Sequence, residues 1–221
     1  MTQTILICGA SRGIGLEMAR QAKARGNRVI ATVRGDTAPL EDIADQVLKC
    51  DVTDEAALAN VADAVGDIDL LVVNAGVYRG RGGIDADDMG ADAWAEVLMT
   101  NVAGPFLAVR ALLPKIKAPG GRIAILSSIM ASSADAPGGS YIYRSSKAGA
   151  TNVARNLAVE LAPRGIAVGA YHPGWVRTDM GGPSAAVSVE DSAAGLLTRF
   201  DALGPETSGV FEDYRGQAIP F

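Results

Sequence analysis

The sequence predicts an α/β fold in which one doubly wound parallel sheet carries helices on both faces. Short apolar runs rich in β-branched residues alternate with longer helical patterns from the first residues onward. A glycine-rich turn also follows the first apolar run and opens the first helical pattern. With 221 residues, and with no internal repeat or low-complexity linker, the chain can build one large core. We therefore expect residues 1–221 to form a single domain.

The expected elements alternate along the whole chain. Strands are predicted at residues 5–8, 28–33, 47–50, 69–73, 122–126 and 167–171, and residues 209–211 are a candidate for a seventh, edge strand. Helices are predicted at residues 13–25, 39–45, 54–65, 91–117, 141–161 and 189–200, with Thr53 or Asp54 capping the third of them. Gly104 and Pro105 fall inside the long fourth helix, where proline removes a hydrogen bond. This pair predicts a bend, or two helices placed end to end.

Composition excludes several classes of function. The formal charge is −5 and Lys and Arg are scattered, which gives no electrostatic footprint for nucleic acid or for an anionic membrane. The first residues show neither a basic segment nor an apolar run long enough to span a membrane, so we expect a cytoplasmic protein. One histidine and two cysteines, Cys8 and Cys50, match no metal spacing. We interpret both cysteines as small buried hydrophobic residues and expect no metal.

The glycine-rich turn reads Cys-Gly-Ala-Ser-Arg-Gly-Ile-Gly over residues 8–15. Gly9, Gly13 and Gly15 would let the backbone approach a diphosphate, and the amides and dipole of the following helix favour negative charge. The spacing differs from G-x-G-x-x-G but shares its physical logic. No Gly-Lys-Ser/Thr ending is present, so a nucleoside-triphosphate loop is not supported. A tight turn without a ligand is the alternative.

A second pattern combines Tyr143 with Lys147, four positions apart on one face of a predicted helix. A free phenol has a pKa near ~10, and a neighbouring ammonium favours its charged form. Such a pair can serve acid–base catalysis, although exposed pairs at this spacing are common. His172 immediately precedes Pro173 and no G-x-S-x-G elbow is present, so we interpret it as a strand-end residue and not as part of a hydrolase triad.

Together with these two patterns, further motifs make the chain resemble the short-chain dehydrogenase/reductase family, most closely its branch of C-factor-like proteins and small carbonyl reductases. The matching motifs, in chain order over residues 9–178, are the glycine turn, Asp51-Val52, Asn74-Ala75-Gly76, Asn101, Ser128, Tyr143 with Lys147, and Pro173-Gly174 with Thr178. The resemblance implies a Rossmann domain with strand order 3-2-1-4-5-6. It places the cofactor at the switch point between the first and fourth strands.

The resemblance also implies roles for individual residues. Tyr143 would act as general acid and base, Ser128 would hydrogen-bond the same substrate oxygen, Lys147 would tune the phenol and hold the nicotinamide ribose, and Asn101 would hold a water for proton relay. The implied cofactor-binding residues are Gly9, Ser11, Arg12, Gly13, Ile14, Gly15, Arg34, Asp51, Val52, Asn74, Ala75, Gly76, Tyr143, Lys147, Pro173, Gly174, Val176 and Thr178.

One spacing departs from the family pattern. Ser128 and Tyr143 are fifteen residues apart, whereas about thirteen is usual in the family, so we expect two inserted residues in the loop at 131–140. Ser127 competes for the role of the serine, but strand alternation points it to the opposite side. Tyr141 competes for the role of the tyrosine, but it lies off the helical face of Lys147.

The second strand ends at Arg34, and Arg12 lies inside the glycine turn, so two cations favour the extra phosphate of NADP(H). Asp36 keeps NAD(H) open as the runner-up. These expectations combine into an NADP(H)-dependent oxidoreductase that interconverts a small-molecule carbonyl and an alcohol. A non-catalytic NADP-binding sensor of the same fold is the alternative, and a hydrolase or dehydratase reusing the cleft is a further rival.

Substrate identity stays open. The segment at 181–189 lies where the family places its substrate lid, and Trp175 would either cover the cofactor or pack. Arg79 and Arg81 would either bind an anionic group or be solvated, and the solvated state is favoured. Family analogy suggests a homodimer or homotetramer through the long helices.

Overall fold

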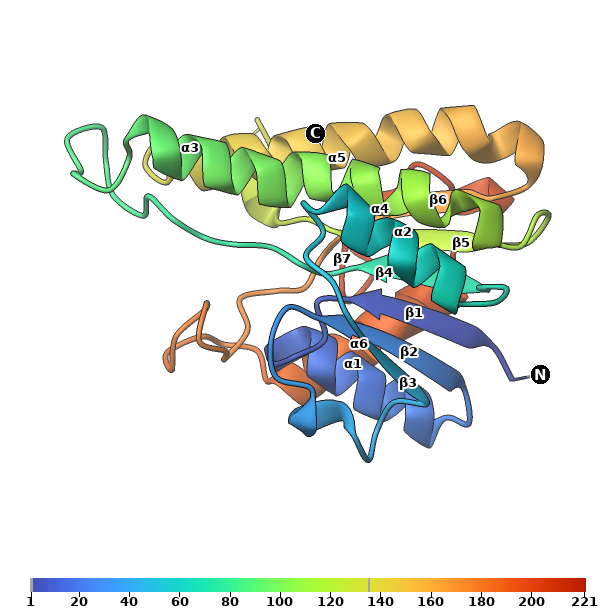
Figure 1. Ribbon diagram of the computed structural model, residues 1–221. Helices are drawn as coiled ribbons and strands as arrows, with labels where there is room; N and C mark the ends of the chain where they lie inside the picture. Colours follow the sequence, from blue (N-terminus) through green and yellow to red (C-terminus); the bar gives the residue numbers. More distant parts are fainter. Residues whose placement is uncertain (1, 135) are drawn as a thin grey trace.

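The computed structural model describes residues 2–134 and 136–221 and contains one parallel sheet of seven strands. Their order is β3-β2-β1-β4-β5-β6-β7, which confirms the predicted fold class and adds the seventh strand at the edge (Figure 1). The strands are β1 (Thr4–Cys8), β2 (Arg28–Val33), β3 (Gln46–Lys49), β4 (Leu70–Val73), β5 (Arg122–Leu126), β6 (Ala167–His172) and β7 (Phe211–Asp213). β7 begins where the predicted edge strand ends, because Gly209 has a positive φ of 88° and belongs to the turn before it.

Helices cover both faces of the sheet (Figure 1). α1 (Gly13–Ala24) and α6 (Val189–Asp201) pack on one face, and α2 (Glu55–Ala64), α4 (Gly104–Leu112) and α5 (Tyr141–Leu161) pack on the other. In β1, Ile5 and Ile7 face the first layer while Leu6 faces the second. This alternation, with apolar side chains on both sides, is expected of a parallel strand buried between two helical layers. The helix predicted at 39–45 is instead a 3₁₀ turn, Ala38–Leu40, followed by turns.

The long helix is continuous from Ala91 to Lys115 but changes its winding on the way. α3 (Ala91–Leu98) leads into a π-helical segment, Met99–Ala103, then α4, then a 3₁₀ turn, Leu113–Lys115. The amide of Gly104 donates to the carbonyl of Met99, five residues back. The irregularity therefore begins five residues earlier than predicted, because the wider π turn accommodates the proline that follows it. By length and apolar composition this helix could cross a membrane, but it packs against α2 and α5 as part of the fold.

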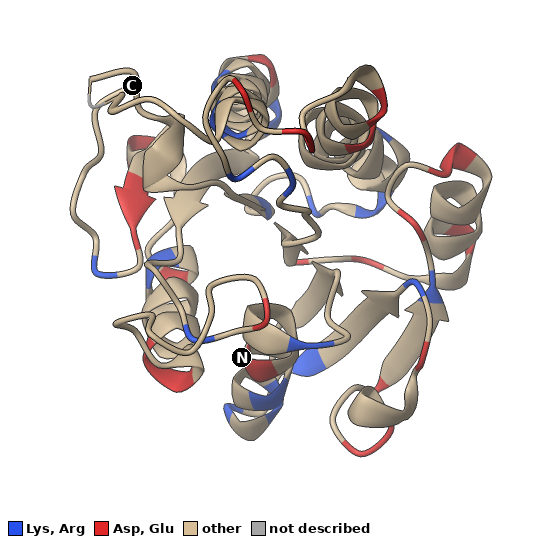
Figure 2. Cartoon of the chain, turned by 90° about the vertical axis from the view of Figure 1, so that its left-hand side faces the viewer, with Lys and Arg blue, Asp and Glu red and all other residues tan. Residues whose placement is uncertain are grey.

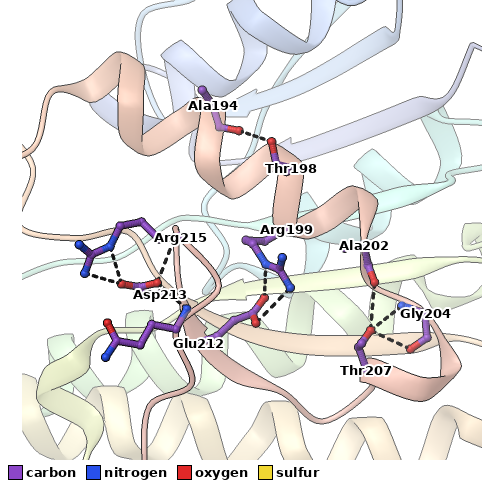
Figure 3. Close-up of polar contacts among 10 residues, drawn as sticks. Ala194, Thr198, Arg199, Ala202, Gly204, Thr207, Glu212, Asp213 and Arg215 are labelled. Atoms are coloured by element: carbon purple, nitrogen blue, oxygen red, sulfur yellow. Dashed lines mark hydrogen bonds and ion pairs between the residues drawn. The ribbon is translucent and has the colours of Figure 1, made fainter.

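The last strand is held by charged side chains (Figure 3). Glu212 is buried and accepts two hydrogen bonds from the guanidinium of Arg199 on α6, at 2.7 and 3.2 Å. The neighbouring Asp213 is also buried and accepts from Arg215. Since a buried carboxylate needs a partner, these two pairs fasten β7 to α6 and to the turn that follows β7.

Candidate active site

A cleft of about 430 Å³ lies at the carboxyl ends of the central strands. Figure 2 looks onto this edge of the sheet and shows basic and acidic residues intermixed in the loops around it. Most predicted cofactor-binding residues line this cleft: Gly9, Ser11, Arg12, Gly13, Ile14, Arg34, Asp51, Val52, Asn74, Ala75, Gly76, Tyr143, Lys147, Pro173 and Thr178. Gly15, Gly174 and Val176 are not among its lining residues, and neither are Asn101 and Ser128. The parallel sheet thus gathers motifs that are far apart in sequence.

The glycine turn is packed too closely for side chains. A Cβ on Gly15 would come within 2.2 Å of the Gly9 carbonyl oxygen, and a Cβ on Gly9 would come within 2.8 Å of the Ala75 Cα. Asn74 donates to the Gly9 carbonyl at 2.6 Å and so clamps the turn onto the end of β4. The result is a backbone cradle at the N-terminus of α1, whose chemistry suits the diphosphate of a dinucleotide.

The two predicted phosphate-binding arginines also line the cleft, Arg12 from within the glycine turn and Arg34 from directly after β2. Arg12 pairs with Asp179 at 2.7 Å, and both side chains are about three-quarters exposed. Arg34 lies 3.9 Å from Asp51, whose carboxylate also accepts from the amide and hydroxyl of Thr53. Asp36, the residue that kept NAD(H) open, accepts from the amide of Ala38 in the following turn and does not line the cleft. Two cations and no competing acid from β2 therefore face the ribose end.

Tyr143 is buried, and its ring stacks on Tyr78 with ring centres 4.1 Å apart. Burial raises the pKa of its phenol to about 12, while the Ser128 hydroxyl and the Arg81 charge act to lower it. The expectation that Lys147 lowers the phenol's pKa is not met, because burial dominates and Lys147 is not among the groups that lower it. The phenol is thus fully protonated at neutral pH.

Lys147 lies beside the ring of Tyr143. Its Nζ lies 5.7 Å from the Tyr143 ring centre and donates to the carbonyl of Leu126 at 2.8 Å. Burial lowers the pKa of this ammonium to about 8. The lysine therefore holds its charge at pH 7 in an environment that opposes it, which is typical of a group with a functional task.

Asn101 sits in the π-helical segment and is almost completely buried. Its side chain accepts from the amide of Val77 at 2.8 Å, and its Nδ2 donates to the Val77 carbonyl at 2.9 Å and to the Ser146 hydroxyl at 3.0 Å. These bonds attach the segment after β4 to the long helix and to α5. The predicted role in holding a water stays a prediction.

The two serines at the end of β5 face different partners, as strand alternation predicts. Ser128 lies against the Tyr143 phenol and caps the following turn by accepting from the amide of Met130. Ser127 instead bonds to the Thr151 hydroxyl and the Lys147 carbonyl inside α5. Tyr141 is 42% exposed. The loop proposed to hold two extra residues includes residue 135, which lies outside the described residues.

Sequence reasoning missed several residues around the cleft. Arg177, Asp179 and Met180 line it and neighbour the predicted Thr178, so their position in the chain was a usable signal. Tyr78 carried no signal, because nothing in its spacing predicts that it stacks on Tyr143. Other cleft-lining residues missed were Cys50, Val77, Thr100, Leu126 and Val189. Ser127, the competitor of Ser128 that was expected to point to the opposite side, also lines the cleft.

Among the remaining titratable candidates, Cys50 lines the cleft, whereas His172 and Cys8 are not among its lining residues. His172 ends β6, as interpreted, and burial lowers its pKa to about 4. Both cysteines are buried, and burial raises the pKa of Cys8 to about 12 and that of Cys50 to about 11. Within residues 2–134 and 136–221 no cluster of three or more His, Cys, Asp or Glu side chains could hold a metal. Trp175 is half exposed and donates to the carbonyl of Gly181.

Comparisons with known proteins agree with this site. Residues 3–187 match the family model of the short chain dehydrogenases. The C-signal protein of Myxococcus xanthus is 39% identical over 161 residues, which cover 71% of this chain and 94% of that protein. The 3-oxoacyl-acyl-carrier-protein reductase FabG of Salmonella typhimurium is 34% identical over 208 residues, covering 89% of this chain and 81% of FabG.

Among solved structures, a carbonyl reductase from Pseudomonas aeruginosa in complex with NADP is 34% identical, with a TM-score of 0.88 and full coverage of both chains. The family match spans most of the chain and every motif described above, while α6 and β7 lie beyond its end. The protein therefore belongs to the short-chain dehydrogenase/reductase family and is an oxidoreductase of its carbonyl reductase and C-factor-like branch.

Proposed function

We propose that the protein is an NADP(H)-dependent oxidoreductase that interconverts a carbonyl and an alcohol. The observation that carries the proposal is one cleft with two chemistries. Tyr143 and Lys147 line it together, and the Ser128 hydroxyl acts on the phenol. Arg12 and Arg34 line it as well and would face the adenosine ribose of the cofactor.

The cleft fits a dinucleotide by its shape and by its donors. The glycine cradle has no room for side chains and presents backbone amides for a diphosphate. Lys147 would hold the nicotinamide ribose, while Asp51 and Val52 would flank the adenine. When bound, the nicotinamide supplies or accepts the hydride. The chain's own residues orient the substrate and manage the proton.

Tyr143 holds its proton at neutral pH because burial raises its pKa to about 12. In the reducing direction the phenol donates this proton to the substrate oxygen, and the Ser128 hydroxyl donates a hydrogen bond to the same oxygen. The Ser128 hydroxyl, which acts to lower the pKa of the phenol, would stabilise the phenolate that remains. In the oxidising direction the same groups act in reverse, and Tyr143 accepts the proton of the alcohol.

The choice of NADP(H) rests on Arg34 and Arg12. A charge-assisted hydrogen bond contributes about 1.5–3 kcal/mol, so losing one weakens binding by roughly tenfold to a hundredfold. Arg34→Ala should therefore weaken NADPH far more than NADH. Equal losses for the two cofactors would contradict the assignment. The NADP named with the Pseudomonas aeruginosa structure supports the same choice.

The activity is tested by following the absorbance of NADPH with a panel of aldehydes, ketones and quinones. Tyr143→Phe keeps the ring and its stack on Tyr78 but lacks the proton, so kcat/KM should fall by about 10²–10⁴. Equal rates for wild type and Tyr143→Phe would refute the catalytic assignment. NADPH binding with no turnover of any carbonyl would instead favour the sensor.

We also propose a cytoplasmic homodimer or homotetramer. Leu98, Met99 and Phe106 on the long helix and Val159 on α5 are exposed, and Val159 is 78% exposed. Apolar side chains on long neighbouring helices favour a subunit interface. Light scattering tests the assembly, and a strictly monomeric mass at micromolar concentration would exclude it.

A further inference from the structure

A cation lies beside Tyr143 in an arrangement that the reaction itself does not require. The Arg81 guanidinium carbon lies 4.5 Å from the centre of the Tyr78 ring, and that ring centre lies 4.1 Å from the ring centre of Tyr143. Tyr78 is held in turn by a hydrogen bond of 2.7 Å between its hydroxyl and that of Ser140. The ring of Tyr78 therefore lies in contact with both the guanidinium of Arg81 and the ring of Tyr143, the proposed acid.

The second contact of Arg81 places it at the rim of the cleft. It donates at 2.7 Å to the carbonyl of Met180, which is a cleft-lining residue in the segment after Thr178. A guanidinium has five N–H donors in a rigid fork, so one bond to a neutral carbonyl leaves most of them available. The aromatic contact and the carbonyl bond together hold the group in place at the mouth of the site.

The other arginine of this loop behaves differently. Arg79 donates two hydrogen bonds to Glu96, at 2.8 and 3.3 Å, so a carboxylate already neutralises it. Arg81 makes no ion pair with any carboxylate among residues 2–134 and 136–221. Arg79 thus forms a surface ion pair, whereas Arg81 is a positive charge with no acid partner in the part of the chain that the structure describes.

We propose that Arg81 is a specificity-determining residue that binds the carboxylate of an oxo-acid substrate, with Tyr78 as the platform that orients its guanidinium. This inference rests on the proposed carbonyl reduction. Arginine binds carboxylates through two parallel hydrogen bonds, so it fixes the orientation of the substrate as well as its charge. The carboxylate is unchanged by the reaction. The carbonyl carbon gains the hydride of NADPH and the oxygen gains the proton of Tyr143, which gives a hydroxy acid and NADP⁺.

The charge has a second consequence that supports this placement. Arg81 acts to lower the pKa of Tyr143, so its field reaches the phenol. The negative charge of a carboxylate bound to Arg81 would offset the effect of the Arg81 charge on the phenol. Since the chain carries a net charge of −5, a local cation is needed for an anionic substrate to approach this face.

The test compares matched acid and ester substrates. Benzoylformate and 3-benzoylpropionate, which place the carboxylate at two distances from the carbonyl, are each compared with their methyl esters by NADPH oxidation. Wild type should show a higher kcat/KM for at least one acid than for its ester. Arg81→Gln should lower the ratio of kcat/KM for that acid to kcat/KM for its ester by about 10- to 100-fold, because an effect of the lost charge on Tyr143 is common to both substrates and cancels in the ratio. Arg79→Gln is the matched control and should change neither substrate by more than about twofold.

The outcomes separate this inference from the proposed function. If the esters are reduced but no acid is preferred, or if Arg81→Gln lowers acid and ester equally, Arg81 has only a structural role and the inference is wrong. If Tyr143→Phe leaves all rates unchanged, or no carbonyl is reduced, the proposed function fails and the inference falls with it. Arg81→Lys gives a further check, because it keeps the charge without the fork and should recover only part of the preference for the acid.

Discussion

Near neutral pH, the buried ammonium of Lys147 should make the cofactor-free wild-type protein less stable than the Lys147→Met variant. Burial lowers the pKa of this group from an ordinary value of 10.5 to about 8 in the folded chain. Between these values the unfolded chain binds a proton that the folded chain does not, so the free energy of unfolding rises with pH. Below pH 8 both states are protonated and the folded protein bears the full cost of the buried charge.

The two pKa values set the size of the effect. At pH 7 the buried charge costs about 3 kcal/mol, and at pH 9 about 2 kcal/mol, since each pKa unit corresponds to about 1.4 kcal/mol. Lys147→Met removes this cost but also leaves the carbonyl of Leu126 without its donor. That loss is about 1–3 kcal/mol and does not depend on pH. The net result is a variant that is up to about 2 kcal/mol more stable than wild type at pH 7 and inactive as a reductase.

Urea unfolding of the unliganded protein, followed by circular dichroism at pH 7, 8 and 9 and one protein concentration, measures the difference. Wild type should gain about 1 kcal/mol relative to Lys147→Met between pH 7 and pH 9. The cysteine thiols are present in both wild type and Lys147→Met, so their contribution to the pH dependence cancels in the difference between the two. Lys49→Met, at an exposed position of the edge strand β3, is the control and should run parallel to wild type. Parallel pH profiles for wild type and Lys147→Met would refute a buried, destabilising charge.

Three further perturbations test other contacts. Asp179→Asn releases Arg12 from an exposed ion pair worth at most about 1 kcal/mol, so the Kd for NADPH measured by fluorescence titration should fall by up to about fivefold. Gly15→Ala places a methyl group 2.2 Å from a backbone oxygen, and the displaced turn should cost about 1–3 kcal/mol in urea unfolding and weaken NADPH binding. Arg199→Met leaves the carboxylate of Glu212, whose side chain is only 7% exposed, without its partner and should cost about 2–4 kcal/mol in the same unfolding assay.

For each of these variants, a different outcome would contradict the expected result. Weaker NADPH binding in Asp179→Asn would mean that the pair preorganises Arg12 instead of competing with the phosphate. An unchanged unfolding midpoint in Gly15→Ala would show that the turn can move aside. Arg215→Met should cost much less than Arg199→Met, because Asp213 keeps backbone donors from Arg215 and Gln217. Equal losses would indicate that the fold does not depend on the Arg199 pair.

The sequence by itself determined the fold and predicted most of the cofactor-binding residues that line the cleft. Alternating apolar runs specify a parallel sheet whose strands all end at one edge, so motifs placed after strands, such as Gly9 and Asn74, must meet there. Helical spacing placed Tyr143 beside Lys147, and strand alternation separated Ser128 from Ser127. These relations depend only on local backbone geometry, which the order of residues encodes directly.

Only the tertiary structure decided the electrostatics and the neighbours contributed by loops. The pKa of Tyr143 depends on how completely packing removes water from the phenol, and spacing alone carries no information about that. The π turn around Asn101 depends on how the long helix accommodates proline while it packs. Arg81 stacks on Tyr78 in its own loop, and its hydrogen bond to the carbonyl of Met180 reaches a segment about a hundred residues away. Such contacts between irregular loops leave no periodic signal in the sequence. Local periodicity thus defined the strands and helices, while long-range packing set the pKa values and the loop contacts around the cleft.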